Sequence, residues 1–243
     1  MLVSKFKKYV DLKVIAIIIL IFATFMSYFK LQKIKANFQF LTKVKNYPFE
    51  DSITVFVGGY STNGLNLMKN ILNDNQLIYC SEENRIINGI LLFTKQHYKQ
   101  IREMQRLLDA GIGKDIVEAA TGAFIRELLV SLGRNTPNIC HIDSNSLLYN
   151  DLISKFMPNT KYILMMDKKI VDNFKKEADI EDLDPFQRSY YKCLKIGQMN
   201  CVIVFHDILL TDPKGEIDKV FSFLNIPWSG DILTLVKEQL LEE

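Results

Sequence analysis

The sequence lacks most of the features that mark nucleic-acid-binding, zinc-binding and disordered proteins. Its 30 Lys and Arg and 28 Asp and Glu give a net charge of +2, so the composition indicates no nucleic-acid partner. The four cysteines form no CxxC pair, the usual spacing of zinc and redox sites. No internal repeat, low-complexity segment or N-x-Ser/Thr glycosylation acceptor is present. The hydrophobic content of 48% is too high for a disordered chain, and 243 residues suffice for one domain with appendages.

One segment lacks charge altogether. Residues 14–29 read VIAIIILIFATFMSYF, which is slightly short for a membrane span, but flanking lysines can extend to the interface of a thin membrane. We expect a cytoplasmic tail at 1–13, a transmembrane signal-anchor at 14–30, a stem at 31–50 and a lumenal domain at 51–243. A cleaved signal peptide and a buried helix are the alternatives. Lysines on both sides of the segment leave its orientation undecided by charge.

The rest of the chain alternates between predicted strands and helices. Short runs of β-branched and aromatic residues predict strands at 53–57, 78–79, 138–143, 161–166 and 201–209. Apolar residues at helical spacing predict helices at 65–73, 86–91, 114–132, 146–156, 184–197 and 212–226. In the longest of these helices, most of the apolar surface comes from Ile116, Ala120, Ala123, Phe124, Leu128 and Val130. This alternation predicts an α/β fold with a parallel sheet and flanking helices.

A glycine-rich turn follows the first predicted strand. Residues 55–72 read VFVGGYSTNGLNLMKNIL, in which Gly59 and Gly64 keep the G-x-x-x-x-G spacing of a phosphate loop. Leu65 and Asn66 follow, where a nucleoside-triphosphate hydrolase has Lys and Ser or Thr. The turn is therefore either a phosphate-binding loop of another kind or an ordinary tight turn.

The segments around this turn resemble the tyrosylprotein sulfotransferases. VFVGGYSTNGLNLMK corresponds to the family's F-I-G-G-V-P-R-S-G-T-T-L-M-R, and CSEENRIING to its C-G-E-E-T-R-I-I-P-R. Further on, KFMPNTKYILMMDK and FSFLNIPWSG correspond to L-F-P-N-S-K-F-L-L-M-V-R-D and L-D-F-L-G-I-A-W-S-D. The resemblance covers residues 50–235 and implies a sulfotransferase fold, which is like that of phosphate-loop nucleotide-binding proteins.

The resemblance implies transfer of a sulfuryl group from PAPS (3′-phosphoadenylyl sulfate) to a peptide tyrosine, which leaves PAP and needs no metal. Because a phenol has a pKa near 10, a base must accept its proton, and Glu82 holds the place of the family's base. Arg85 matches a family arginine that could pair with acidic residues beside the tyrosine. From the residues alone, Glu82 also fits a solvated helix start, and Arg85 a surface ion pair.

All four cysteines lie beyond the apolar segment. An even number there is compatible with two disulfides in an oxidising compartment, and four separate buried thiols are the alternative. The resemblance implies the pairs Cys80–Cys140 and Cys193–Cys201.

Departures from the family pattern gather on the donor-binding side. In the turn, Thr62, Asn63, Leu65 and Asn66 replace the family's Arg, Ser and two Thr, and only Gly64 is unchanged. Elsewhere the family's Lys, Arg, Ser, Arg and Tyr are replaced, in that order, by Ile142, Asp167, Lys175, Asp179 and His206. The chain also stops at Glu243, before the family's segment over the adenine and 3′-phosphate.

These departures reduce positive charge where a polyanionic donor would bind. Each lost charge-assisted contact to phosphate costs about 1.5–3 kcal/mol, so three losses would weaken PAPS binding by several orders of magnitude. Lys168, Lys169 and Lys175 are the residues that could compensate.

Two functions therefore stay open. The first is a Golgi tyrosylprotein sulfotransferase, a single-pass type II protein that acts on secretory or membrane proteins with acidic tyrosine-containing segments. The second is a non-catalytic relative that keeps the anchor, fold and disulfides and binds such peptides or an active relative. A truncated gene product is a third reading. The resemblance also suggests a homodimer, which no residue pattern in this chain fixes.

Overall fold

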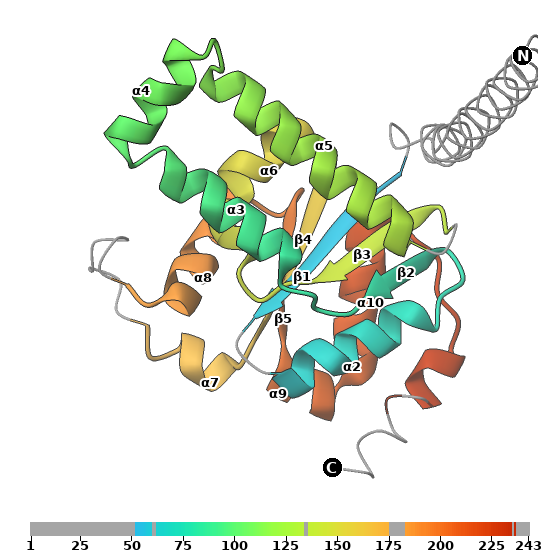
Figure 1. Cartoon of the computed structure of the whole chain (residues 1–243). Coiled ribbons are helices and arrows are strands. Elements are labelled where there is room, and N and C mark those ends of the chain that lie inside the picture. Colours follow the sequence, from blue (N-terminus) through green and yellow to red (C-terminus); the bar gives the residue numbers. More distant parts are fainter. Residues whose placement is uncertain (1–51, 60–61, 134–135, 175–182, 235, 237–243) are drawn as a thin grey trace, which may run out of the picture. The chain divides into compact units, whose positions relative to one another are not determined.

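A computed structural model of the chain describes residues 52–59, 62–133, 136–174, 183–234 and 236 (Figure 1). These residues belong to one unit of the chain, Pro48–Glu243. Their centre is a five-stranded parallel sheet with the strand order β2-β3-β1-β4-β5. The strands are β1 (Thr54–Gly59), β2 (Ile78–Ser81), β3 (Asn138–Ile142), β4 (Thr160–Met166) and β5 (Cys201–Phe205).

Helices cover both faces of the sheet, and alternate residues of β1 contact the two layers. Val55 and Val57 pack with α2 (Thr62–Asn73), α9 (His206–Thr211) and α10 (Pro213–Leu224). Phe56 packs in the other cluster, with α3 (Ile86–His97), α5 (Lys114–Leu132), α6 (Asn150–Phe156) and α8 (Pro185–Ile196). Strands buried on both faces read as continuous apolar runs. The predicted α/β fold with a parallel sheet and flanking helices is confirmed.

Three further elements are shorter or less buried. They are the helix α4 (Ile101–Asp109), the 3-10 turn η1 (Ser146–Tyr149) and the single-turn helix α7 (Lys168–Val171). Helix α4 was not predicted from the sequence, and it has no buried residue. The prediction of a strand through residue 209 was wrong, since β5 ends at Phe205 and helix α9 begins at His206. A short apolar run does not distinguish the end of a strand from the start of a helix.

The apolar surface named for residues 114–132 is not the surface that α5 buries. The residues that α5 buries are Thr121, Gly122, Ile125 and Leu129, whereas Ile116 and Phe124 are 50% and 48% exposed. Thr121 is buried because its hydroxyl shares a 3.0 Å hydrogen bond with Thr94 of α3. Gly122 is buried because Phe156 of α6 packs against its backbone, where a Cβ would lie 2.5 Å from the ring. Close contacts of Thr121 and Gly122 with neighbouring helices, together with burial of Ile125 and Leu129, set the orientation of α5.

The predicted anchor at 14–30 and stem at 31–50 lie outside the described residues. Among the helices that the structure describes, none is both long enough and apolar enough to cross a membrane.

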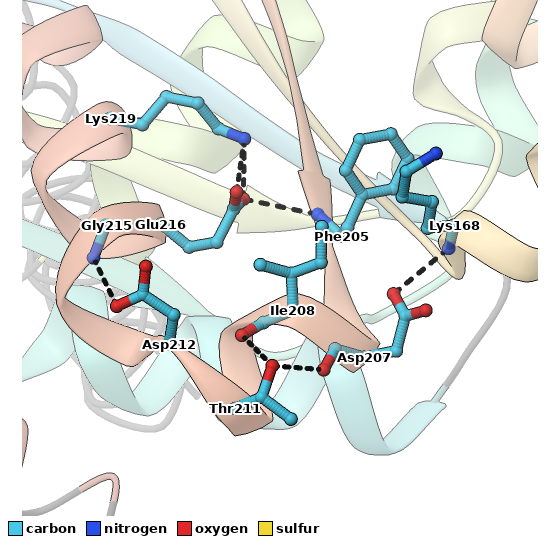
Figure 2. Close-up of polar contacts among 9 residues, drawn as sticks. All are labelled: Lys168, Phe205, Asp207, Ile208, Thr211, Asp212, Gly215, Glu216 and Lys219. Atoms are coloured by element: carbon cyan, nitrogen blue, oxygen red, sulfur yellow. Dashed lines mark hydrogen bonds and ion pairs between the residues drawn. The ribbon is translucent and has the colours of Figure 1, made fainter.

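The junction from β5 to α10 is fixed by a buried carboxylate (Figure 2). Glu216 of α10 is only 8% exposed. Its Oε2 accepts a hydrogen bond from the Phe205 backbone N–H at 3.3 Å, and Lys219 donates to its Oε1 at 2.7 Å. Asp212 caps α10 by accepting from the Gly215 N–H, and Asp207 accepts from the Lys168 N–H at the start of α7. The ends of β4 and β5 are thereby tied together.

The glycine pair at the end of β1 packs against its two neighbouring strands. A Cβ on Gly58 would lie 2.9 Å from the carbonyl oxygen of Asp143, which follows β3. A Cβ on Gly59 would lie 2.1 Å from the carbonyl oxygen of Met165 in β4, and its φ is +153°. Only glycine fits this position without moving backbone.

The Gly59→Ala variant is therefore expected to lose about 3 kcal/mol or more of folding free energy, or to fail to fold. The matched control is Gly89→Ala in α3, where an added Cβ meets nothing within 4 Å. That control should be neutral or stabilising by about 0.5–1 kcal/mol. Urea unfolding of both variants measures the difference, and equal midpoints would contradict the close contact at Gly59.

A second prediction concerns Glu216. Glu216→Leu leaves the buried Phe205 N–H without its acceptor and should lower the free energy of unfolding by about 1–3 kcal/mol. Glu216→Gln keeps an acceptor oxygen and should lower it by less. Urea unfolding of the pair is the measurement, and an equal loss in both would show that the hydrogen bond is unimportant.

Candidate functional site

The predicted site residues that the structure describes lie near the ends of the strands, which is where α/β proteins with parallel sheets bind ligands. The glycine turn after β1 leads into α2, Glu82 follows β2, Asp167 follows β4, and His206 follows β5. Segments far apart in the sequence thus converge at one edge of the sheet (Figure 1).

The glycine turn presents backbone rather than side chains at the start of α2. Leu65 is 4% exposed and belongs to the hydrophobic core, so it cannot replace the hydroxyl of the family's Thr. Asn66 is exposed on the other side of the helix. Thr62 and Asn63 open α2, but their side chains lie outside the described part of the structure. The backbone N–H groups of this first helical turn remain the donors suited to an anion.

His206 and Asp167 lie beside this turn. A Cβ on Gly64 would be 3.1 Å from His206 Cδ2, so the ring packs directly on the first turn of α2. His206 Nδ1 is 3.7 Å from the Asp167 carboxylate, and its Nε2 is buried without a hydrogen-bond partner in the described structure. A carboxylate therefore occupies the place where the resemblance puts an arginine.

Lys168, one of the lysines that could compensate for the lost arginines, is directed elsewhere. The Lys168 ammonium pairs with Asp172 at 2.8 Å and lies 5.8 Å from the centre of the Phe205 ring. Lys169 is exposed on α7. Lys175 and Asp179 lie outside the described residues.

Glu82 lies on the opposite side of the turn and has a specific partner. Its Oε1 accepts a 2.6 Å hydrogen bond from the Lys69 ammonium of α2, although the Glu82 side chain is 77% exposed. Arg85 is exposed at the N-terminus of α3 with a φ of 56°, a left-handed conformation that is uncommon for a non-glycine residue. Lys69 was not predicted as a site residue, because no sequence motif marks a lysine of α2 that reaches Glu82 across the fold.

The two implied disulfides are present. Cys80–Cys140 joins paired positions of β2 and β3, and Cys193–Cys201 joins α8 to β5. Asn73 at the end of α2 also holds Cys80, since its Oδ1 accepts from the Cys80 N–H at 2.6 Å and its Nδ2 donates to the Cys80 carbonyl. Glu82 is thus two residues from a position fixed by a covalent bond and by two hydrogen bonds.

A buried polar cluster lies below Glu82. The Ser81 hydroxyl is 2.7 Å from His141 Nδ1, and both residues are buried. Burial lowers the pKa of His141 to about 4. Burial raises the pKa of Asp143 to about 6, assisted by the nearby Glu83 and opposed by the Asn145 and Ser146 N–H groups. Ile142 is 4% exposed in the core, so it offers nothing in place of the family's Lys.

Comparison with known proteins identifies the family. A model described as "Sulfotransferase family" matches residues 54–230, which is most of the chain. The chain belongs to the sulfotransferase family. Its curated relatives include protein-tyrosine sulfotransferase A of Caenorhabditis elegans, 29% identical over 195 residues, and protein-tyrosine sulfotransferase 2 of Gallus gallus, 28% identical over 195 residues. Human protein-tyrosine sulfotransferase 1 is 27% identical over 202 residues. The resemblance inferred from the motifs is confirmed, at the distance of a divergent member.

The alignments cover a larger share of this chain than of its relatives. Each alignment covers 74–76% of this chain but only 51–54% of the relative, so the chain spans about half the length of the curated relatives it matches. Among solved structures, sulfotransferase STF9 from Mycobacterium avium is 10% identical, with a TM-score of 0.48, over 86% of this sulfotransferase chain and 72% of that one.

The buried cluster predicts opposite pH effects in two variants. Because the folded state binds the His141 proton more weakly than the unfolded chain, its stability contribution is present above pH 6.5 and lost as the pH falls toward 4. Asp143 binds its proton more strongly when folded, so its contribution is present below its ordinary pKa of 3.8 and lost as the pH rises through 6. The two contributions oppose each other in this window.

His141→Asn should therefore raise the free energy of unfolding at pH 4.5 relative to that at pH 7, compared with the parent protein. Asp143→Asn should lower it at pH 4.5 relative to pH 7. Each shift is on the order of 2 kcal/mol. Urea unfolding at both pH values is the measurement, and comparing pH differences removes any packing effect of the substitutions. The same pH dependence in both variants and the parent would refute the burial of these groups.

Proposed function

We propose that this sulfotransferase-family protein transfers a sulfuryl group from PAPS to the phenolic oxygen of peptide tyrosines, with Glu82 as the base. The observation that carries the proposal is the 2.6 Å pair of Glu82 with Lys69, on the segment that matches the family's C-G-E-E motif. The curated relatives, which are named protein-tyrosine sulfotransferases, support the substrate class.

The pair with Lys69 suits a base that must stay in place. Lys69 donates to Oε1 of Glu82, and Oε2 is left to accept the phenolic proton as the oxygen attacks sulfur. The new bond joins the phenolic oxygen to sulfur, while the bond from sulfur to the phosphate oxygen breaks and PAP leaves with the electron pair. Since Glu82 is largely exposed, the ion pair adds little stability and acts mainly in positioning.

The residues present fit PAPS in part. The start of α2 offers backbone N–H groups to the 5′-phosphosulfate, and the glycine pair keeps the strand end close to the helix. The side chains do not add positive charge, because Leu65 is in the core and Asp167 lies beside His206. We therefore propose weak donor binding that depends chiefly on backbone groups.

A non-catalytic role is the second candidate. The specific observation in its favour is the Asp167 carboxylate 3.7 Å from His206, which faces the turn where a polyanion would bind. Such a protein would bind acidic tyrosine-containing peptides through the Arg85 side of the site, or would pair with an active relative.

We also propose the setting of this function. The two disulfides support an oxidising compartment, and a single-pass type II protein of the Golgi membrane with a lumenal domain is consistent with the charge-free segment 14–30. The proposed partners are secretory or membrane proteins with acidic tyrosine-containing segments, and a homodimer is the proposed assembly.

Donor binding separates the two candidates. A ligand of the folded state raises the apparent melting temperature, so PAP at millimolar concentration should stabilise the protein by a few degrees. Adenosine at the same concentration is the control, since it lacks the phosphates. Absence of any shift with PAP would eliminate the transferase proposal and leave the non-catalytic one.

The base is tested by transfer of labelled sulfate from PAPS to an acidic tyrosine peptide. Glu82→Gln should lower the rate by about 10²–10⁴ while leaving the PAP-induced shift unchanged, because the base is lost and the donor site is not. Glu83→Gln, at the adjacent exposed glutamate, is the matched control and should keep most of the rate. Undiminished turnover in Glu82→Gln would exclude Glu82 as the base.

A further inference from the structure

A second cavity, remote from the glycine turn, has no place in the proposed reaction. Its volume is about 260 Å³, and its walls come from the end of α3, the start of α5, η1 and α6. Helix α3 starts beside Glu82 and Arg85 and runs away from the strand ends toward α4 (Figure 1). At a rise of about 1.5 Å per residue, its far end lies well beyond contact distance of Arg85.

The lining of this cavity is strongly basic. Lys95, Lys99, Lys114 and Lys155 face it, against only Glu118 and Asp151, which leaves an excess of two positive charges. Glu118 is already paired with Lys155 at 2.8 Å and with Lys114 at 3.8 Å. Asp151 is paired with Lys192 at 3.6 Å. Within the described residues, neither Lys95 nor Lys99 has an ion-pair partner.

Aromatic rings hold two of these lysines in place. The Lys95 ammonium lies 5.5 Å from the centre of the Tyr149 ring, and the Lys114 ammonium 4.7 Å from that of Tyr98. The Tyr98 hydroxyl also donates to the Lys114 carbonyl at 3.3 Å. Tyr149 is 7% exposed, so its ring forms a fixed floor. Cation–π contacts of this kind limit the freedom of otherwise mobile lysine side chains.

Positive charge is crowded around this floor. Lys192 donates to the Leu148 carbonyl and to Asn150 Oδ1 behind the cavity. Burial lowers the pKa of Lys192, Asp151 opposes that effect, and the neighbouring positive charges of Lys95 and Arg188 lower the pKa further. Arg188 Nε is itself buried without a hydrogen-bond partner in the described structure. An anion bound in the cavity would reduce the repulsion among these positive charges.

We propose that this cavity is a binding site for a compact dianionic oxyanion, a sulfate or phosphate group, held chiefly by Lys95 and Lys99. The two excess positive charges match a dianion. The volume is just below the range of about 300–1,000 Å³ that is usual for drug-sized ligands, so a small anionic group fits better than a whole nucleotide. Lysine ammonium groups are common phosphate ligands as point charges.

The test is a calorimetric titration of the full chain with inorganic sulfate and with inorganic phosphate at constant ionic strength. Both should bind saturably, and Lys95→Gln/Lys99→Gln should weaken them at least about tenfold, since two charges are lost. The matched control is Lys195→Gln/Lys214→Gln, which removes the same charge at exposed positions of α8 and α10 and should leave the affinity unchanged.

A second variant acts in the opposite direction. Glu118→Gln removes a carboxylate from the lining and should tighten oxyanion binding several-fold, whereas a general loss of folding would weaken it. Melting temperatures of all variants identify any that unfold. Equal affinities in the Lys95→Gln/Lys99→Gln variant, its control and the parent would overturn the proposal.

Two further arms locate the anion and its source. Saturating PAP should leave sulfate binding in place, and loss of sulfate binding with PAP would show that the oxyanion occupies the glycine turn instead. A peptide with one phosphotyrosine, whose phosphate ester is largely dianionic at neutral pH, is compared with inorganic phosphate. Tighter binding that depends on Lys95 and Lys99 assigns the cavity to a phosphate ester on a polypeptide, and equal affinity assigns it to the free ion. Because inorganic ions are used, a failure of the proposed transfer reaction would leave this test intact.

Discussion

The close approach of Gly58 and Gly59 to the carbonyl oxygens of Asp143 and Met165 is the constraint on which the site depends. It brings the ends of β3, β1 and β4 together with no side chain between them. Everything that follows those strands, namely the turn into α2, the buried Asp143 and the Asp167 side chain, is placed by this backbone contact. The glycines are therefore as much a feature of sheet packing as of anion binding.

The sequence was informative where local signals and tertiary structure agree. Apolar runs and helical spacing predicted the five strands and most helices, and the family resemblance implied the two disulfides. It failed where a contact between elements decided the outcome. Gly122 and Thr121 are buried in α5 because Phe156 and Thr94 meet them, and no periodicity within residues 114–132 contains that information. Helix α4 was missed because it buries nothing.

For the candidate site, the sequence predicted which residues lie at the strand ends but not which side chains pair. The motifs located Glu82, Arg85 and His206 at the strand ends, but they could not show that Lys69 pairs with Glu82 or that Lys168 turns to Asp172. Side-chain pairing depends on distances across the fold, which sequence spacing does not specify. The described residues keep Glu82 and Arg85 beyond the end of β2, whereas Leu65, Ile142 and Asp167 stand where the resemblance puts polar or positive side chains. The proposed donor site would therefore depend chiefly on backbone groups.

The disulfide between Cys80 and Cys140 has a consequence for the position of Glu82, the proposed base. Strand β2 lies at the edge of the sheet, with hydrogen-bonded neighbours on one side only, and it is four residues long. Such a strand frays readily, and Glu82 is the residue that follows its last residue, Ser81. The disulfide and the two hydrogen bonds between the Asn73 side chain and the Cys80 backbone therefore limit the thermal displacement of the Glu82 carboxylate. In a reducing environment the residue assigned to accept a proton would be held by hydrogen bonds alone, so the precision of the site would depend on the redox state of its surroundings.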